Sequence, residues 1–209
     1  DSLSFTEAAA VGVPYITAME ALDRSGVKKN TRFLVIGAAG AVGSAAIALA
    51  TQRGAKILAA VRKPAQQAAL QAQGIDSILL TDEASLAGDV EKYFAGGADS
   101  VFDTTGFWLA GAVSALHLYG TVAVIAAPFA RMAEFPLLDF YRRGANIVGV
   151  NSLLHDLPTS ALMLDQLRGM FDAGMTKPGK LRECALRDGI GVYRDVDSGC
   201  GEKCVFVMG

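Results

Sequence analysis

One stretch of small residues has a spacing that can do chemistry. Residues 33–50 read FLVIGAAGAVGSAAIALA, in which a short apolar run leads into the pattern Ala38-x-Gly40-x-x-Gly43. In such a turn Ala38 would take the tight bend, Gly40 would let the backbone approach a pyrophosphate, and Gly43 would let the next helix pack closely on the strand. The free N–H groups and positive dipole end of a helix beginning near Ala41 would then face the phosphates.

The same spacing also has an interpretation without chemistry, because small residues occur wherever a helix packs tightly on a strand. The context favours phosphate binding, since the motif follows a strand, opens a helix and begins a series of further strand–helix units. The stretch therefore predicts a turn that binds a dinucleotide.

A basic pair follows the next apolar run, where residues 57–61 lead directly into Arg62 and Lys63. At this place a carboxylate would bind the ribose 2′-OH of NAD, whereas a basic residue would accept a 2′-phosphate. Arginine can stack on adenine and bind phosphate, and lysine adds a point charge. The pair predicts NADP(H) rather than NAD(H) or S-adenosylmethionine, with a solvated basic turn as the alternative interpretation.

These residues need a sheet to position them. Short runs rich in Val, Ile and Leu alternate with longer segments of helical spacing, which is typical of a parallel sheet with crossover helices. The expected strands are 31–37, 55–61, 76–80, 98–104, 120–126 and 145–150, and the expected helices are 41–53, 64–73, 84–94, 107–118 and 135–143. Because the strands are nearly continuous hydrophobic runs, both faces should be covered. The fold class is α/β, a doubly wound, six-stranded Rossmann sheet.

Two segments lie outside this sheet and give a division into three parts. We expect a helical lead-in over 1–30, in which Ser4 and Glu7 are spaced as a capping box and Pro14 breaks the run. The dinucleotide-binding domain covers 31–152. Residues 153–209 form an extension with a helix over 158–173 and a strand over 204–208, separated by loops marked by Pro178, Gly179 and Gly189.

Composition limits the classes of function. The chain has 209 residues, 52% of them hydrophobic and 19% charged, which is typical of a globular domain. A formal net charge of −2 argues against nucleic acid as a partner. No apolar run is long enough to span a membrane, and no signal peptide is recognisable, so we expect a soluble, cytoplasmic protein. The three cysteines, Cys184, Cys200 and Cys204, are expected to be reduced thiols and not metal ligands.

The chain resembles the medium-chain dehydrogenase/reductase superfamily, and most closely its zinc-independent quinone oxidoreductase branch. The segments that carry the resemblance are LSFTEAAAVGVPYITAMEAL, GAAGAVGSAAIALA, SVFDTTG, FPLLDFYRRGANIVGVNS and EKCVFVM. The first two together are specific, and the others are weaker but occur in the right order.

The resemblance implies which residues hold the cofactor. Thr17 and, after the sixth strand, Asn151 and Ser152 would lie near the nicotinamide, whereas Arg62 and Lys63 would face the 2′-phosphate. The other expected cofactor-binding residues belong to the turn and to the ends of the fourth and fifth strands: Ala38, Ala39, Gly40, Ala41, Val42, Gly43, Thr104, Thr105, Gly106, Ala126 and Ala127. The alternative for the threonines and Asn151 is that they only cap loops.

The resemblance also has departures. Gly12 stands where zinc-dependent relatives have a metal-binding cysteine, so no metal site is expected. In the family a barrel-like catalytic domain precedes the lead-in, and we expect that it is missing here and that the strand 204–208 would normally join it. The whole enzyme would transfer hydride from NADPH to a quinone, an enone or a similar activated double bond, and this chain alone would be inactive. The alternative is a non-catalytic module that senses NADP(H) or supports assembly.

No catalytic residue is assigned. Tyrosines 15, 119, 141 and 193 are expected to serve packing, and His117, inside a predicted helix, and His155 are expected to have structural roles. A homodimer is plausible through the apolar sheet edge between Asn146 and Asn151, because an uncovered edge strand is a liability for a monomer. The expected substrate is a small molecule.

Overall fold

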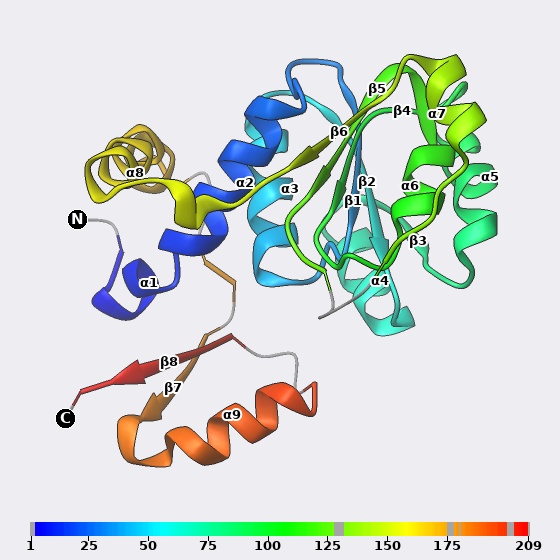
Figure 1. Ribbon diagram of the computed structural model, residues 1–209. Coiled ribbons are helices and arrows are strands. Elements are labelled where there is room, and N and C mark those ends of the chain that lie inside the picture. Colours follow the sequence, from blue (N-terminus) through cyan, green and yellow to red (C-terminus); the bar gives the residue numbers. More distant parts are fainter. Residues whose placement is uncertain (1–2, 128–131, 175–177, 180, 200–202, 209) are drawn as a thin grey trace. The chain divides into compact units, whose positions relative to one another are not determined.

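Six parallel strands form one sheet in the order β3-β2-β1-β4-β5-β6 (Figure 1). The computed structural model describes residues 3–127, 132–174, 178–179, 181–199 and 203–208. The strands are β1 Arg32–Ile36, β2 Lys56–Val61, β3 Asp76–Leu79, β4 Ala98–Asp103, β5 Leu116–Val124 and β6 Asn146–Gly149. This strand order confirms the predicted Rossmann sheet, whose order changes direction between β1 and β4.

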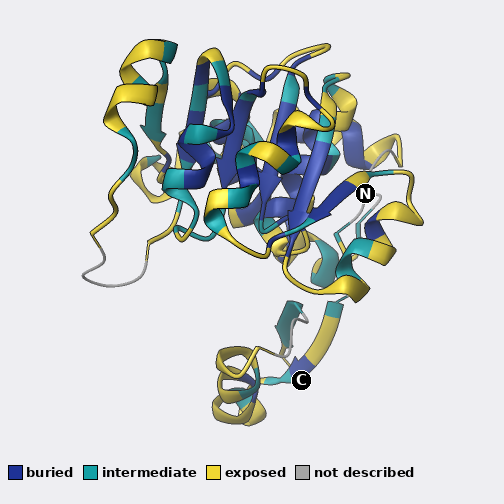
Figure 2. Ribbon diagram, turned by 90° about the vertical axis from the view of Figure 1, so that its right-hand side faces the viewer, coloured by how far each residue is buried: buried dark blue, intermediate teal, exposed yellow. Residues whose placement is uncertain are grey.

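The central strands are buried because helices cover both faces of the sheet (Figure 2). The helices that connect the strands are α3 Ala41–Gln52, α4 Pro64–Gln71, α5 Leu86–Glu91, α6 Leu109–Ser114 and α7 Leu137–Arg143, with a 3₁₀ turn, η1 Glu83–Ser85, before α5. In Figure 1, α3 lies on one face and α5, α6 and α7 lie on the other. Gly54 and Gly74 follow α3 and α4 with φ of +73° and +76°, the left-handed conformation in which many helices end.

The fourth connection differs from its prediction. The helix expected over 107–118 ends at Ser114, and β5 already begins at Leu116. The reason is long-range pairing: Leu116 is fully buried and pairs with Ala98, after which the register shifts and Thr121 pairs with Ser100. Tyr119, within this irregular stretch, has φ of +60°.

The chain divides into two compact units, Thr17–Asn151 and Asp1–Ile16 with Ser152–Gly209. The first unit contains the sheet. The second contains the elements α1 Phe5–Ala9, η2 Ser152–Leu154, α8 Leu157–Asp172, β7 Leu181–Ala185, η3 Leu186–Asp188, α9 Gly189–Asp197 and β8 Lys203–Val207. Helix α2 Gly12–Arg24 runs through the boundary at Thr17.

The second unit departs from the prediction at two places. The capping box at Ser4 is confirmed, since its hydroxyl accepts from the Glu7 N–H and the Glu7 carboxylate accepts from the Ser4 N–H. Pro14, however, lies in the first turn of α2 and does not break it. Gly189 begins helix α9 and does not mark a loop.

The last strand finds a partner inside this unit. β8 pairs in parallel with β7, a strand that was not predicted, with Cys184 opposite Phe206. Neither Cys184 nor Cys204 forms a disulfide, and Cys200 lies outside the described residues. Among the described helices, none is both long enough and apolar enough to cross a membrane.

Candidate functional site

The glycine-rich turn bends at Gly37. This residue has φ of +79°, and a Cβ atom there would lie 2.3 Å from the Thr104 Oγ1 atom, so only glycine fits. The N–H groups of Gly37 and Ala38 both donate to the Ala60 carbonyl, at 3.0 and 3.2 Å. The expectation that Ala38 takes the tight bend is therefore wrong, because the left-handed conformation belongs to the residue before it.

Gly43 packs directly on this bend. A Cβ atom at Gly43 would lie 2.4 Å from the Gly37 carbonyl oxygen and 2.8 Å from the Ala38 Cα atom. Gly40 caps α3 in an extended conformation, and its N–H donates to the Gly37 carbonyl at 2.9 Å. The close packing of helix on turn that the spacing predicted for Gly43 is present.

The start of α3 offers hydrogen-bond donors. The N–H groups of Ala41, Val42 and Gly43 lie in the first turn, where an α-helix has no carbonyl of its own to receive them. Ala39, Gly40 and Ala41 are exposed. With the positive end of the helix dipole, these donors fit a diphosphate.

The basic pair follows the neighbouring strand. Arg62 and Lys63 come directly after β2, which pairs with β1, and both side chains are exposed. Lys63 precedes α4, and its N–H donates to Gln66 Oε1 at 3.3 Å. Within the described part of the chain, neither basic side chain takes part in an ion pair. Both are therefore available to an anionic ligand.

Asp103, which the sequence did not single out, organises the loop after β4. Its side chain is fully buried, and its Oδ1 atom accepts from the Thr105 N–H at 2.8 Å, the Thr105 hydroxyl at 2.8 Å and the Gly106 N–H at 3.1 Å. The Oδ2 atom accepts from the Trp108 N–H at 3.2 Å. An acidic residue at the end of a buried strand, followed by Thr-Thr-Gly, is the signal that could have identified it.

Two more contacts bring the strand ends together. The Thr104 hydroxyl donates to the Ile36 carbonyl at 2.8 Å, which joins the ends of β4 and β1. Gly106 has φ of +73°, and a Cβ atom there would lie 2.1 Å from the Ala126 carbonyl oxygen. Ala126 and Ala127 follow β5 and are exposed. The residues predicted at the ends of β1, β4 and β5 thus meet at one edge of the sheet.

The remaining predicted residues lie on other elements. Thr17 is a buried residue of α2, 6% exposed, and Asn151 is exposed after β6. Ser152 begins η2 in the other compact unit. Their contacts with a cofactor stay predictions.

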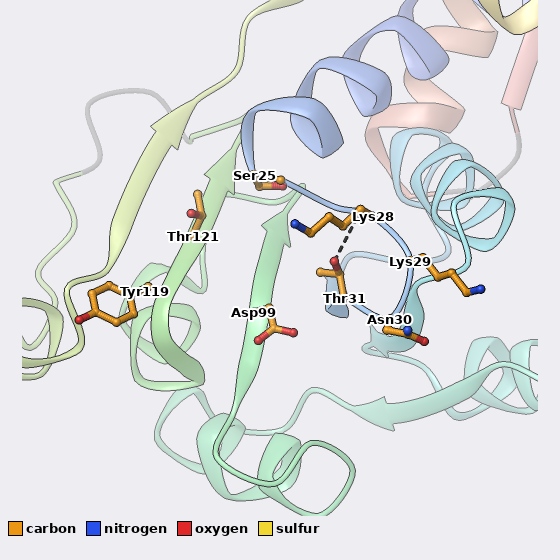
Figure 3. A pocket seen from close by; sticks show the side chains of 9 residues that line it. Ser25, Lys28, Lys29, Asn30, Thr31, Asp99, Tyr119 and Thr121 are labelled. Atoms are coloured by element: carbon orange, nitrogen blue, oxygen red, sulfur yellow. Dashed lines mark hydrogen bonds between the residues drawn. The ribbon is translucent and has the colours of Figure 1, made fainter.

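A pocket of about 340 Å³ lies at the opposite edge, near the amino ends of β1 and β4 (Figure 3). Its lining is mostly polar and consists of Ser25, Gly26, Lys28, Lys29, Asn30, Thr31, Asp99, Tyr119 and Thr121. None of these residues belongs to the glycine-rich turn. We place the candidate site at the carboxyl edge, because ligands of such sheets bind outside the carboxyl ends of the strands.

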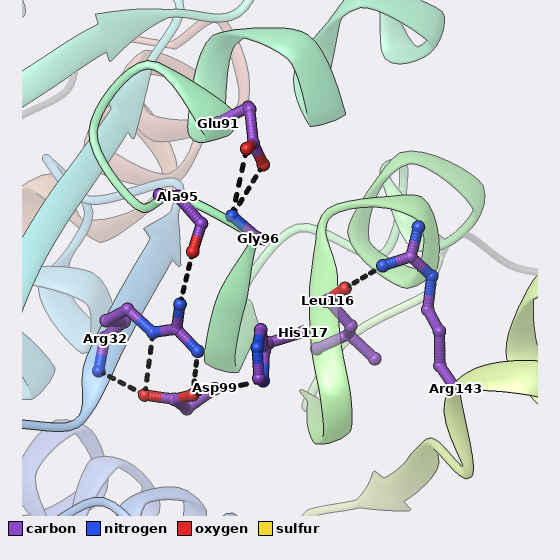
Figure 4. Close-up of polar contacts among 8 residues, drawn as sticks. All are labelled: Arg32, Glu91, Ala95, Gly96, Asp99, Leu116, His117 and Arg143. Carbon is purple, nitrogen blue, oxygen red and sulfur yellow. Dashed lines mark hydrogen bonds and ion pairs between the residues drawn. The ribbon is translucent and has the colours of Figure 1, made fainter.

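An ion pair between Arg32 and Asp99 lies at this amino edge (Figure 4). The Arg32 guanidinium donates to both oxygens of Asp99, at 3.1 and 2.5 Å. Burial would raise the pKa of Asp99, but the hydrogen bonds and charge of Arg32, with a contribution from His117, hold that pKa below its usual value. His117 lies on β5 and not on a helix, and its Nδ1 atom is 4.0 Å from Asp99 Oδ1, so it has a partner that the sequence did not reveal.

The chain is similar to known dehydrogenases and oxidoreductases. Residues 41–165 match the profile of the family described as zinc-binding dehydrogenase. The zinc-type alcohol dehydrogenase-like protein C337.11 of Schizosaccharomyces pombe is 35% identical over 214 residues, covering 99% of this chain and 62% of that protein. Human quinone oxidoreductase is 35% identical over 94 residues, covering 44% of this chain and 29% of that protein.

A solved structure shows the same fold over nearly the whole chain. The alcohol dehydrogenase superfamily protein of Novosphingobium aromaticivorans superposes with a TM-score of 0.81 and 26% identity, covering 94% of this chain and 60% of that one. The chain spans about three fifths of the length of the fission yeast relative and of this solved structure, 62% and 60%.

Proposed function

The chain belongs to the zinc-binding dehydrogenase family of the medium-chain dehydrogenase/reductase superfamily, and on this premise we propose that it holds the cofactor of an NADPH-dependent oxidoreductase that reduces a quinone, an enone or a similar activated double bond. The cofactor of this domain is NADP(H). When bound, NADPH supplies the hydride. The protein binds and orients the cofactor and excludes water from the site.

One observation carries the proposal: a phosphate-binding turn and a free basic pair stand on neighbouring strands. The start of α3, which packs on the Gly37 bend, offers N–H donors for the diphosphate. Arg62 and Lys63 follow β2, which pairs with β1, and suit the 2′-phosphate of the adenosine half.

The sheet topology orients the cofactor. The crevice for a ligand lies where the strand order reverses, between β1 and β4. With the 2′-phosphate on the β2 side, Gly106 and Ala126, at the ends of β4 and β5, would border the nicotinamide half, which supplies the hydride when bound.

The substrate class rests on the relatives. Human quinone oxidoreductase, which is similar over 94 residues, acts on a quinone by its name. A quinone contains carbon–carbon double bonds that its carbonyl groups activate. The double bond of an enone is activated in the same way, so both compounds can accept a hydride from NADPH. Among the described residues, no group of three or more His, Cys, Asp or Glu side chains could hold a metal ion.

A homodimer through the edge of the sheet is part of the proposal. β6, Asn146–Gly149, is the last strand in the sheet order, and β5 pairs with it on one side. A second copy would pair with backbone groups of this edge strand, other than the Gly149 carbonyl, which accepts from the Arg24 guanidinium. Light scattering tests this association, and a monodisperse monomer would contradict it.

The first experiment measures cofactor choice. We expect Arg62→Ala/Lys63→Ala to weaken NADPH binding by about 10- to 100-fold while the Kd for NADH stays the same, because only NADPH carries the 2′-phosphate. The matched control is Lys28→Ala/Lys29→Ala, which removes two exposed lysines at the amino edge and should leave both Kd values unchanged. Equal losses for NADPH and NADH would contradict the assignment.

The second experiment measures turnover. Loss of NADPH absorbance is followed with a quinone and with an enone, in this chain and in a fusion that restores the length of the fission yeast relative. We expect turnover by the fusion alone. Tight NADPH binding without turnover in either protein would support the non-catalytic module instead.

A further inference from the structure

In the loop after β4, every backbone N–H group donates a hydrogen bond to an acceptor within the protein. Over residues 104–108 the acceptors are Ile36 O for Thr104 at 3.2 Å, Asp103 Oδ1 for Thr105 at 2.8 Å and Gly106 at 3.1 Å, Thr105 Oγ1 for Phe107 at 3.3 Å, and Asp103 Oδ2 for Trp108 at 3.2 Å. Both threonine hydroxyls are also donors to protein acceptors, Ile36 O and Asp103 Oδ1. Among the described contacts, this loop therefore has no backbone N–H group and no threonine hydroxyl proton left for a ligand.

Asp103 is the acceptor for most of these donors. Its carboxylate is 0% exposed, and it receives four hydrogen bonds from three residues of the loop. A buried carboxylate needs such partners, and charge-assisted bonds of this kind are strong and directional. The loop is consequently held in one shape by a single side chain.

The shape of this loop matters for the site beside it. Gly106 lies against the Ala126 carbonyl, and Thr104 lies against the Gly37 bend, so the loop borders both the turn and the end of β5. Its position on the β4 side corresponds to the nicotinamide half of the cofactor, whereas Arg62 and Lys63 lie on the β2 side.

We infer that Asp103 is a positioning residue of the cofactor site, which makes the loop 104–108 an acceptor surface for the nicotinamide half by withdrawing its donors. Carbonyl oxygens and hydroxyl lone pairs on this loop can accept from ribose hydroxyls, and they offer nothing to a phosphate. Between these two loops, the free backbone N–H donors for the diphosphate then lie at the start of α3, which favours one register of the cofactor. This inference rests on the proposed function.

Asp103→Asn tests it, because an amide nitrogen cannot accept the N–H groups that the lost carboxylate oxygen accepted. Binding is measured for NADPH and for adenosine 2′,5′-bisphosphate, which lacks the nicotinamide half. We expect the Kd for NADPH to rise at least tenfold while the Kd for the bisphosphate changes less than twofold. A purely structural role would weaken both ligands alike and would overturn the inference, as would an unchanged Kd for NADPH.

The matched control is Asp99→Asn, at the other end of the same strand, where the carboxylate binds Arg32 and faces the amino edge. It should leave the Kd values for both ligands unchanged. A wild-type chain that does not bind the bisphosphate would count against the proposed function and not against the role of Asp103.

If Asp103→Asn binds neither ligand or does not fold, amide hydrogen exchange of a milder variant tests whether these hydrogen bonds hold the loop 104–108. The milder variant Thr105→Val removes one hydroxyl donor and the acceptor of the Phe107 N–H, and it keeps the carboxylate. We expect faster exchange at residues 105–108 and unchanged exchange at Gly40 and Ser44, with Thr105→Ser restoring protection. Equal exchange in Thr105→Val and the wild type would overturn the inference.

Discussion

Two loops at the carboxyl edge of the sheet use their backbone donors in opposite ways. The turn from Gly37 to Gly43 ends in a helix whose first N–H groups have no helical acceptor. The loop 104–108 directs all its backbone N–H groups into the protein, most of them to Asp103. Thr104 joins the two loops through the Ile36 carbonyl.

The difference shows how one edge can treat two halves of a ligand differently. Free N–H groups near a helix dipole attract an anion, whereas a loop with its donors already used presents acceptors and apolar surface. The free first turn of α3 on one side and the Asp103 carboxylate on the other make this distinction. Substitutions that disturb one loop should therefore leave different signatures from those that disturb the other.

The turn 37–43, with the free N–H groups at the start of α3, is here the donor loop, and the loop 104–108 is the acceptor loop. The largest effect is expected from Gly43→Ala, in the donor loop. The new Cβ atom would lie 2.4 Å from a backbone oxygen, Gly37 O, so α3 must move away from the bend. We expect a loss of about 1–3 kcal/mol in the free energy of unfolding and at least a tenfold weaker Kd for both NADPH and NADH, because both carry the diphosphate. Urea unfolding and fluorescence titration measure these quantities.

Gly88→Ala is its control, since Gly88 lies in α5 with no atom within 4 Å of a new Cβ. That change should stabilise the protein slightly, by up to about 1 kcal/mol, and leave binding alone. Normal binding of NADPH by Gly43→Ala would break the assignment of the donor loop.

The next effect concerns Gly106→Ala, in the acceptor loop. Here a Cβ atom would lie 2.1 Å from the Ala126 carbonyl oxygen, at φ of +73°. Gly74→Ala has nearly the same φ, +76°, but no neighbour within 4 Å, so it isolates the conformational cost of about 1–2 kcal/mol. We expect Gly106→Ala to destabilise the chain more than Gly74→Ala in urea unfolding. Equal losses would show that the contact with Ala126 is not tight.

A smaller effect is expected from Thr104→Val, which cuts the link between the loops. The lost hydroxyl bond to Ile36 O should cost about 1 kcal/mol in the free energy of unfolding. Thr51→Val is the control, because its hydroxyl bonds only to Ile47 O one turn back in α3. Thermal and urea unfolding compare the free energies of unfolding of the two variants. A larger loss of stability in Thr51→Val than in Thr104→Val would contradict a stabilising link between the loops.

The smallest effect belongs to Asp99→Asn, at the amino edge. The pKa of Asp99 is lowered in the folded chain, so its stabilisation is present above about pH 4, the unfolded value, and is lost as the pH falls through the folded value. Because this carboxylate is partly exposed, we expect a difference below about 1 kcal/mol at pH 7, shrinking toward pH 3. Urea unfolding at both pH values measures it, and a difference that grows on acidification would contradict the sign.

Much of the sheet could be predicted because its strands are short, continuous apolar runs bounded by glycine and proline. The departures have a common cause in contacts between distant residues. Glycines at 189 and 191 disfavour a helix, yet α9 forms with Val192 buried and with Tyr193 against Phe206, their rings 6.2 Å apart. Strand β7 exists only as the partner of β8.

By itself the sequence determined the sheet, the glycine-rich turn and the basic pair after β2, since each depends on the types and spacing of neighbouring residues. Only the tertiary structure decided that Gly37 makes the bend, that His117 lies beside Asp99, and that Asp103 holds the loop 104–108. The bend is dictated by the close approach of Thr104, 67 positions away. The physical reason is that such roles depend on which strand ends meet in space.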